Sequence, residues 1–356
     1  MIERWLDSTS DASPGWADRL SAAIAARSIP EQVVYSLAWL VLFAAITAVE
    51  WSAGAYAPPS LLPLHAVLAA GVVVPVYLVR IFNRSAVAAM VRVRPLLAVD
   101  DAYAEIMTRR LTSTPFRLEV VVVVFWLAVT IARIWIDPSW WKSLQLALVA
   151  PAGAIAVLLI LAFVISVATL GVKIAYMGTV IWHISQRELS VSIWELGPLH
   201  GFSILTAQFA GTLMALAVAI YAARPELLKD ALGIASGLFG VFFAGAIFVV
   251  PLLGIHNRLV SEKGRLRGEA AKTMEAAIRG LHLAIETSDV AAMDAHYKAV
   301  AAVEIELRTL SAIPTWPWLP DTFRWVVGAL MFPLVLFVIQ FVITQIAAAG
   351  PAQPAA

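Results

Sequence analysis

A few uncharged polar side chains interrupt long apolar stretches, and they are the chain's best candidates for chemistry. Gln340, Thr344 and Gln345 lie in the last apolar stretch, and Gln208 and Thr212 lie in an earlier one. A helix would place Gln340 and Thr344 on one face, because they are four residues apart. An amide in hydrocarbon is unfavourable without a partner or water. These side chains therefore line a water-filled pathway, or they form hydrogen bonds between helices.

The chain lacks the residue groupings that enzymes use. It has no cysteine, no phosphate-binding glycine loop, no nucleophile elbow and no HExxH motif. None of the six histidines is spaced four residues from another, and only His65 lies inside an apolar stretch. A haem held by two histidines is therefore not expected. The sequence predicts no catalytic residue, no metal site and no cofactor, and the protein is not expected to be an enzyme.

Charged residues are rare in the apolar stretches and stand near their ends, as Glu119 and Arg133 do. Proton-driven transport needs ionisable groups deep in the membrane, so this pattern argues against a proton-coupled pump.

A second group of candidates surrounds the connection between the first two apolar stretches. It comprises Glu50, Trp51, Tyr56 and His65. These side chains are expected to line an outer ligand pocket. Trp51 is equally explained as an anchor at the level of the lipid headgroups, where tryptophan is enriched.

The stretch AIPTWPWLPD (312–321) predicts an elbow between a charged helical region and the last apolar stretch. Pro314, Pro317 and Pro320 forbid a continuous helix, and Trp316 and Trp318 favour the headgroup depth. The elbow is either a simple anchor or a rigid coupler that transmits movement from the charged region to the last stretch.

The elements that must position these residues are helices in a membrane. The chain has 356 residues, of which 61% are hydrophobic and 14% charged, so it has too much apolar surface for a soluble fold. Most apolar stretches approach the ~20 residues that cross a bilayer. The sequence predicts an all-α polytopic protein with about seven transmembrane helices: 33–49, 61–82, 120–132 (118–136 at full length), 144–170, 202–222, 231–254 and 325–349.

The distribution of lysine and arginine predicts the orientation. The first 30 residues hold three, the loop 83–117 holds six, and the region after the sixth span holds eight; Lys173 and Arg187 are assigned to the same side. By the positive-inside rule the N-terminus is cytoplasmic and the C-terminus is outside. The expected location is the cell (inner) membrane, crossed several times.

The division of the chain follows from these patterns. Ser13 as N-cap and Pro14 at the first helical position predict an interfacial amphipathic helix near the N-terminus. After the sixth span, two apolar stripes with helical spacing predict an antiparallel coiled-coil hairpin. The expected units are 1–30 (interfacial helix), 31–254 (spans one to six, with the basic loop 83–117), 255–313 (cytoplasmic hairpin), 314–321 (elbow), 322–349 (span seven) and 350–356 (disordered tail).

The two hairpin stripes are predicted from residues spaced three, four or seven apart. The first consists of Leu259, Leu266, Ala270, Met274, Ile278, Leu281 and Ile285, and the second of Val290, Met293, Tyr297, Val300, Val303, Leu307 and Leu310. Asp100 and Asp289 are expected to cap the helices that follow them. Gly233, Gly237 and Gly240 give the sixth span a small-residue face, suited to close helix packing or to a subunit contact.

Two resemblances add to these patterns. The segments LGPLHGFSIL and PLLGIHNRLVSEKGRL are similar to uncharacterised polytopic membrane proteins of bacteria and archaea, in which a PLHPD-type turn precedes paired glycines; here Gly201 and Phe202 follow the histidine. The topology, and Gln340-Phe341 in PLVLFVIQF (333–341), resemble the seven-span insect gustatory and odorant receptor channels, although Pro333-Leu334 replaces the Thr-Tyr of that signature. This second resemblance implies a homotetrameric cation channel with the last span lining the pore.

The sequence therefore predicts an oligomeric channel or channel-like receptor, with the hairpin mediating assembly and span seven lining the pore. The expected partners are the lipid bilayer, further copies of the chain (a tetramer is favoured) and an ion or small-molecule ligand, but no nucleic acid. One alternative is a non-conducting sensor or scaffold whose hairpin binds a protein. Another is a transporter of a neutral or apolar substrate.

Overall fold

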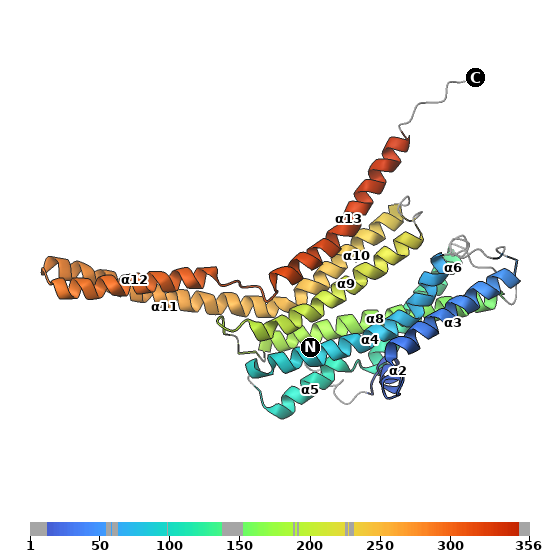
Figure 1. Cartoon of the computed structure of the whole chain (residues 1–356), viewed down its shortest axis with the longest axis horizontal. Helices are drawn as coiled ribbons and strands as arrows, with labels where there is room; N and C mark the ends of the chain where they lie inside the picture. Colours follow the sequence, from blue (N-terminus) through green and yellow to red (C-terminus); the bar gives the residue numbers. More distant parts are fainter. Residues whose placement is uncertain are drawn as a thin grey trace, which may run out of the picture.

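The computed structural model is a helical bundle from which a long arm projects (Figure 1). It describes residues 13–54, 58, 63–97, 99–136, 152–187, 189–190, 192–224, 227 and 231–348. Within these ranges the chain is helical and forms no strand, although two isolated bridges join Pro14 to Pro115 and Leu97 to Leu189. The helices are α2 (Trp16–Ala25), α3 (Glu31–Ser52), α4 (Pro63–Val93), η1 (Arg94–Leu96), α5 (Asp101–Thr112), α6 (Phe116–Ile136), α8 (Ala152–Arg187), η2 (Gly197–Leu199), α9 (His200–Ala223), α10 (Ala231–Val249), η4 (Val250–Leu252), α11 (Leu253–Glu286), α12 (Val290–Ala312) and α13 (Pro320–Ala348).

Five helical segments among the described residues are long and apolar enough to cross a membrane. They are Glu31–Ser52, Pro63–Leu96, Ala152–Gln186, Gly197–Ala223 and Gly233–Glu286. The predicted third and seventh spans coincide with α6 and α13, which are not among these five, so their crossing stays a prediction. The fourth span differs from its prediction, because α8 continues to Arg187 and carries Lys173 inside the helix.

The core of the bundle lies where α4, α8 and α9 pack together. Phe82 of α4 and Phe209 of α9 form an edge-to-face pair whose ring centroids are 4.9 Å apart. At the start of α9, a Cβ atom on Gly201 would come within 3.0 Å of the Cα atom of Ala89. Only glycine allows the two backbones to approach this closely, so Gly201 sets the spacing of α4 and α9 at this end.

The N-terminal segment is bound to the bundle through its backbone. The predicted N-cap at Ser13 is wrong, because α2 begins at Trp16 and has Gly15 at its N-cap, with no hydrogen bond from a capping side chain. The amide of Gly15 donates to the carbonyl of Thr114 (2.9 Å), and the amide of Phe116 donates to the carbonyl of Ser13 (3.1 Å). Since Ser13 is occupied with this backbone pairing, it precedes the helix instead of capping it.

The basic loop 83–117 is mostly helical. Helix α4 extends through Arg84 and Arg92 to Val93, and α5 follows after the turn at Pro95. The predicted cap at Asp100 is confirmed, because its Oδ1 accepts a hydrogen bond of 2.8 Å from the amide of Tyr103.

The arm consists of α11 and α12, which lie side by side, and it continues from α10 through η4 (Figure 1). The chain reverses at Thr287–Asp289, where Ser288 has a φ of 55°. The predicted cap at Asp289 is confirmed, since its Oδ1 accepts a 3.0 Å hydrogen bond from the amide of Ala292.

The contact between the two arm helices agrees with the predicted stripes at Ala270, Val303 and Leu310 and differs from them at other positions. The buried side chains in this contact are Ala270, Ala277 and Ala284 of α11 and Val303 and Leu310 of α12. Four predicted stripe residues are exposed instead, with exposed fractions of 38% for Ile278, 54% for Ile285, 73% for Val290 and 66% for Tyr297. These four assignments are wrong, because small side chains bring the helices together and turn the neighbouring large ones outward.

The predicted small-residue face of α10 is only partly used within one chain. Gly233 and Gly237 are buried. A Cβ atom on Gly240 would meet no atom of the described residues within 4 Å. Gly240 therefore leaves room for a contact with another helix.

Candidate functional site

The pore candidates lie on α9 and α13. Gln340, Thr344 and Gln345 belong to the second half of α13, but their side chains lie outside the described part of the structure. Gln208 lies one turn before Gly211 on α9, and a Cβ atom on Gly211 would overlap the ring of Trp325 at the start of α13. Gln208 therefore lies near α13, whereas Thr212 is about 100° further round the helix than Gly211.

Gln208 differs from the other polar side chains of α9. The hydroxyl groups of Ser203 and Thr206 each donate to the carbonyl three residues earlier in the same helix, at a distance of 3.1 Å. The Oε1 atom of Gln208 is buried and accepts no hydrogen bond from the described residues. A buried amide oxygen without a partner is unfavourable, so Gln208 is suited to meet water or another chain.

The outer-pocket candidates occupy the ends of α3 and α4. Glu50 and His65 are both buried, with 2% of each exposed, while Trp51 is partly exposed. Tyr56 lies outside the described residues. A cavity of about 470 Å³ between α3 and α4 is lined by other residues, among them Tyr35 and Trp39. The outer pocket stays a prediction.

The elbow is the most densely connected of the predicted sites. Trp316 stacks on Trp318 with ring centroids 4.2 Å apart, and Trp318 contacts Phe248 of α10 at 5.2 Å. The ring of His256 in α11 stacks on the other side of Trp316 at 4.0 Å. Pro317 is buried in this contact. The aromatic side chains therefore join the elbow to both α10 and α11.

Three side chains that the sequence did not single out bind the backbone of the elbow. The Nδ1 atom of His200 lies 2.9 Å from the carbonyl of Pro317, and that of His256 lies 3.0 Å from the carbonyl of Thr315. Both histidines must carry a proton on Nδ1, because a carbonyl only accepts. Lys263 donates to the carbonyl of Ile313 (2.6 Å) and to that of Ser311 (3.0 Å). No spacing signal relates these residues to the elbow, which is 50 residues or more away in the chain.

Pro314 and Pro320 mark the ends of the elbow. Helix α12 ends at Ala312, two residues before Pro314. Helix α13 begins at Pro320, so Pro320 and Asp321, which the sequence placed in the elbow, belong to α13. Proline at the first helical position is favourable, because its missing N–H has no partner there in any case. The elbow thus ends at Leu319. Its carbonyls at Thr315 and Pro317 accept from α11 and α9, and Lys263 of α11 binds the carbonyls of Ser311 and Ile313 just before the elbow.

We expect the hydrogen bond of His256 to limit local opening of the elbow. His256→Phe keeps a ring against Trp316 but loses the hydrogen bond, worth about 1 kcal/mol, so amide exchange at 313–319 should rise about fivefold. His256→Leu loses the stack as well and should exchange faster still. Hydrogen exchange followed by mass spectrometry measures both. His282→Phe, on the exposed face of the arm, should leave the elbow unchanged; equal exchange in all three variants would contradict the role of His256.

A buried polar cluster connects the N-terminal segment to α4 and α8. The Nζ atom of Lys173 donates to Oδ1 of Asp18 (2.9 Å) and to the carbonyl of Thr112 (2.6 Å). Asn83 also donates to Oδ1 of Asp18 (2.9 Å), and the amide of Thr114 donates to its Oδ2 (3.0 Å). The side chains of Lys173 and Asp18 are only 2% and 10% exposed. This cluster was missed because Asp18 and Lys173 are 155 residues apart.

Glu119 extends this polar region along the same segment. Its Oε2 accepts from the amide of Trp16 (3.0 Å), and the indole of Trp16 donates to the hydroxyl of Thr169 (3.0 Å). The carboxylate thus binds an N–H at the start of α2, where helices favour negative charge. Glu119 lies in the first turn of α6, near the end of the predicted span, and its side chain is buried against α2.

An apolar cavity of about 640 Å³ lies between α6, α8, α9 and α10. Val122 and Trp126 of α6, Val167 of α8, Leu213 of α9 and Phe243 of α10 are among the side chains that line it. A second apolar cavity of about 290 Å³ adjoins it and shares Ala175 and Thr179. Such surfaces suit an apolar molecule or lipid chain.

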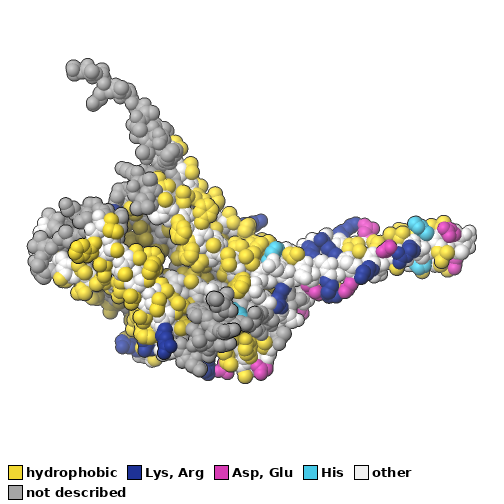
Figure 2. Space-filling view, turned by 180° about the vertical axis from the view of Figure 1, so that it is seen from behind, with side chains coloured by type: hydrophobic (Ala, Val, Ile, Leu, Met, Phe, Trp, Pro, Cys, Tyr) yellow, Lys and Arg dark blue, Asp and Glu magenta, His cyan; other side chains and the backbone are white. Residues whose placement is uncertain are grey.

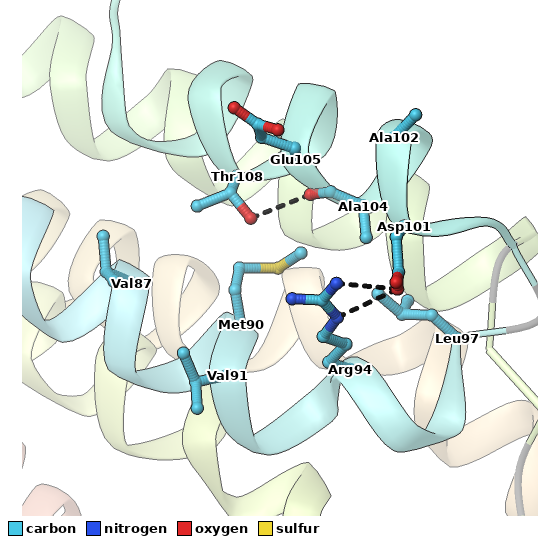
Figure 3. A pocket seen from close by; sticks show the side chains of 10 residues that line it. All are labelled: Val87, Met90, Val91, Arg94, Leu97, Asp101, Ala102, Ala104, Glu105 and Thr108. Atoms are coloured by element: carbon cyan, nitrogen blue, oxygen red, sulfur yellow. Dashed lines mark hydrogen bonds and ion pairs between the residues drawn. The ribbon is translucent and has the colours of Figure 1, made fainter.

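Figure 3 shows a smaller cavity of about 390 Å³ between α4 and α5. Arg94 points to Asp101 across it, with Nη2 and Oδ1 2.7 Å apart. Glu105 at its rim is paired with Arg109 (3.0 Å). These charges neutralise one another and dock α5 on α4, so they leave no group poised for chemistry among the residues that line this cavity.

No protein-family model, no curated protein and no solved structure matches the chain.

Proposed function

We propose that the protein is an oligomeric, channel-like receptor of a cell membrane. In this proposal the arm is cytoplasmic and mediates assembly, and α13 is the seventh span and lines a passive path for ions. The resemblance of Gln340-Phe341 to the last span of the insect receptor channels agrees with this assignment of α13.

The observation that carries the proposal is the apolar surface of the arm. Residues 255–312 contain eight basic and eight acidic side chains, so this region belongs in water. Several large apolar side chains are nevertheless exposed there, including Leu283 (61%) and Ile305 (66%) as well as Ile285, Val290 and Tyr297. Covering such a side chain stabilises by roughly 1.5–3 kcal/mol, so a partner is expected on this surface.

The charges of the arm favour a second copy of the chain as this partner. Helix α11 carries six basic and four acidic residues, whereas α12 carries two basic and three acidic ones. Two arms that project from the same membrane are parallel, and in the proposed two-fold packing α11 of one arm lies beside α12 of the other. The excess charges of these two helices are opposite and attract.

The elbow supports a link between assembly and the membrane. His256 and Lys263 bind it from α11, and His200 binds it from α9. A change in how the arms pair is therefore transmitted to the start of α13. Gln208, whose Oε1 lacks a partner among the described residues, also lies near α13.

The test is to measure assembly and current on the same purified protein. We expect an oligomer in native mass spectrometry and unitary currents in a planar bilayer. Ile285→Glu should weaken self-association roughly tenfold or more, because each interface loses a buried apolar side chain. Thr273→Glu, exposed on the same helix, is the matched control. A wild-type monomer that is silent at both polarities and in several salts would contradict the proposal and favour a non-conducting sensor or scaffold.

One observation favours a second candidate function. The apolar cavity of about 640 Å³ between α6 and α10 has the size and lining of a site for a small apolar molecule. A transporter of a neutral or apolar substrate would use such a cavity without an oligomer. Substrate-dependent flux through a monomer in vesicles would favour this function over the channel.

A further inference from the structure

A basic pocket of about 550 Å³ lies between α2, α4 and the turn after α5. Arg19 of α2 and Arg80 and Arg84 of α4 line it, with Asp18 and Asn83 beside them. Figure 2 shows basic side chains (dark blue) at the lower left edge of the apolar surface, where α2 lies. The pocket adjoins the buried cluster of Asp18, Asn83 and Lys173, but its three arginines belong to none of the sites described above.

The pocket keeps an excess of positive charge after its internal ion pairs are counted. Glu31 is the carboxylate partner of both Arg84 (2.7 Å) and Arg80 (3.4 Å), and it uses one oxygen for both. Asp18 is neutralised by Lys173. Each guanidinium has five N–H donors, so Arg80, Arg84 and Arg19 retain donors for an anion. Arg84 has 55% of its side chain exposed and can reach a ligand from solvent.

The depth of the pocket matches the headgroup level of a bilayer. Arg80 lies 17 residues after Pro63 at the start of α4, which is about 26 Å along a helix. Arg84 lies one turn further, at about 32 Å. A hydrocarbon layer is ~30 Å thick. Glu31, which pairs with both arginines, is the first residue of α3, so α3 begins beside this level of α4.

An apolar groove leads from this pocket into the membrane. The cavity of about 470 Å³ between α3 and α4 extends from Tyr77 to Ala66 on α4, roughly 16 Å at 1.5 Å per residue. Tyr77 precedes Arg80 by three residues, so the groove and the basic pocket adjoin on neighbouring turns. The hydroxyl of Tyr35 in this groove is buried and has no hydrogen-bond partner among the described residues.

We propose that the basic pocket binds the phosphate of an anionic phospholipid and that one acyl chain of this lipid lies in the α3–α4 groove. Arg80, Arg84 and Arg19 bind the phosphate oxygens, as guanidinium groups do in other phosphate sites. The phenol of Tyr35 is placed to donate to an ester carbonyl where the acyl chain begins. Basic pockets at membrane-helix ends recognise lipid headgroups by this chemistry.

The experiment titrates the delipidated full-length protein with phosphatidylglycerol, phosphatidylcholine or inorganic phosphate in native mass spectrometry. We expect phosphatidylglycerol to bind most tightly. Arg84→Gln should weaken it about tenfold, the effect of a lost charge-assisted hydrogen bond. Arg94→Gln, in η1 directly after α4 and outside the pocket, is the matched control. Arg19→Gln is a second variant, which leaves no carboxylate of the described residues without its ion-pair partner, and it should also weaken binding.

A third variant distinguishes a lipid from a free phosphate. Val74→Trp fills the groove, where Val74 is 41% exposed, and should weaken phosphatidylglycerol but not inorganic phosphate. If phosphatidylglycerol and inorganic phosphate bound equally tightly and Val74→Trp changed neither, the proposal of a bound lipid would be overturned and the pocket would be a simple anion site. Equal binding of phosphatidylcholine, or no effect of both arginine variants, would overturn the proposal.

Discussion

Lys173→Met is expected to lower the free energy of unfolding by roughly 3–5 kcal/mol, the usual cost of leaving one partner of a buried ion pair alone. The variant removes the ammonium that lies 2.9 Å from Asp18 and 2.6 Å from the carbonyl of Thr112. Asp18 then remains beside α8 with its charge uncompensated and only 10% of its side chain exposed. Unfolding followed by circular dichroism in detergent measures the loss.

Two further variants test whether the buried charge is the cause. Combining Lys173→Met with Asp18→Asn removes both charges and should recover part of the stability, because the one oxygen that remains can still accept from Asn83 or from the amide of Thr114, which bind different oxygens of Asp18. Lys298→Met breaks an exposed ion pair with Asp294 and should cost less than about 1 kcal/mol. If Lys173→Met cost no more than Lys298→Met, the buried cluster would not stabilise the fold.

Gln340→Leu is expected to abolish the unitary current of the reconstituted oligomer. In the proposed function this residue lies in the part of α13 that lines the path. An apolar side chain at a narrow hydrated position favours dewetting, which closes a pore to ions. Planar-bilayer recording measures the current, and native mass spectrometry checks that the number of subunits is unchanged.

The matched variants separate polarity from size. Gln340→Asn keeps an amide and should retain current, although of altered conductance. Val338→Leu changes an apolar side chain on the same helix, where Val338 is 62% exposed, and should have no effect. Wild-type current in Gln340→Leu would exclude Gln340 from the path that the ions take.

The exposed stripe of the arm illustrates the limit of periodicity. A spacing of three, four or seven residues predicts that side chains lie on one helix face. Ile278 and Ile285 have this spacing, and their neighbours Ala277 and Ala284 have it too. The structure buries the alanines. The ring of His296 lies where a Cβ atom on Gly280 would be, so the two helices approach closely only along the small-residue side.

The sequence by itself determined the features that depend on neighbouring residues. Long apolar stretches form helices because every backbone group in hydrocarbon must be bonded within its own segment. The caps at Asp100 and Asp289 and the interruption between Pro314 and Pro320 follow from local backbone chemistry.

Tertiary structure alone decided which distant polar groups meet. Asp18 and Lys173, or His256 and the carbonyl of Thr315, are far apart in the chain, and no local pattern relates them. The predicted fourth span ends at residue 170, before Lys173, whereas α8 continues to Arg187. The physical reason is that a buried charge or carbonyl needs a partner of the right chemistry at hydrogen-bond distance, and the packing of helices determines which residue supplies it.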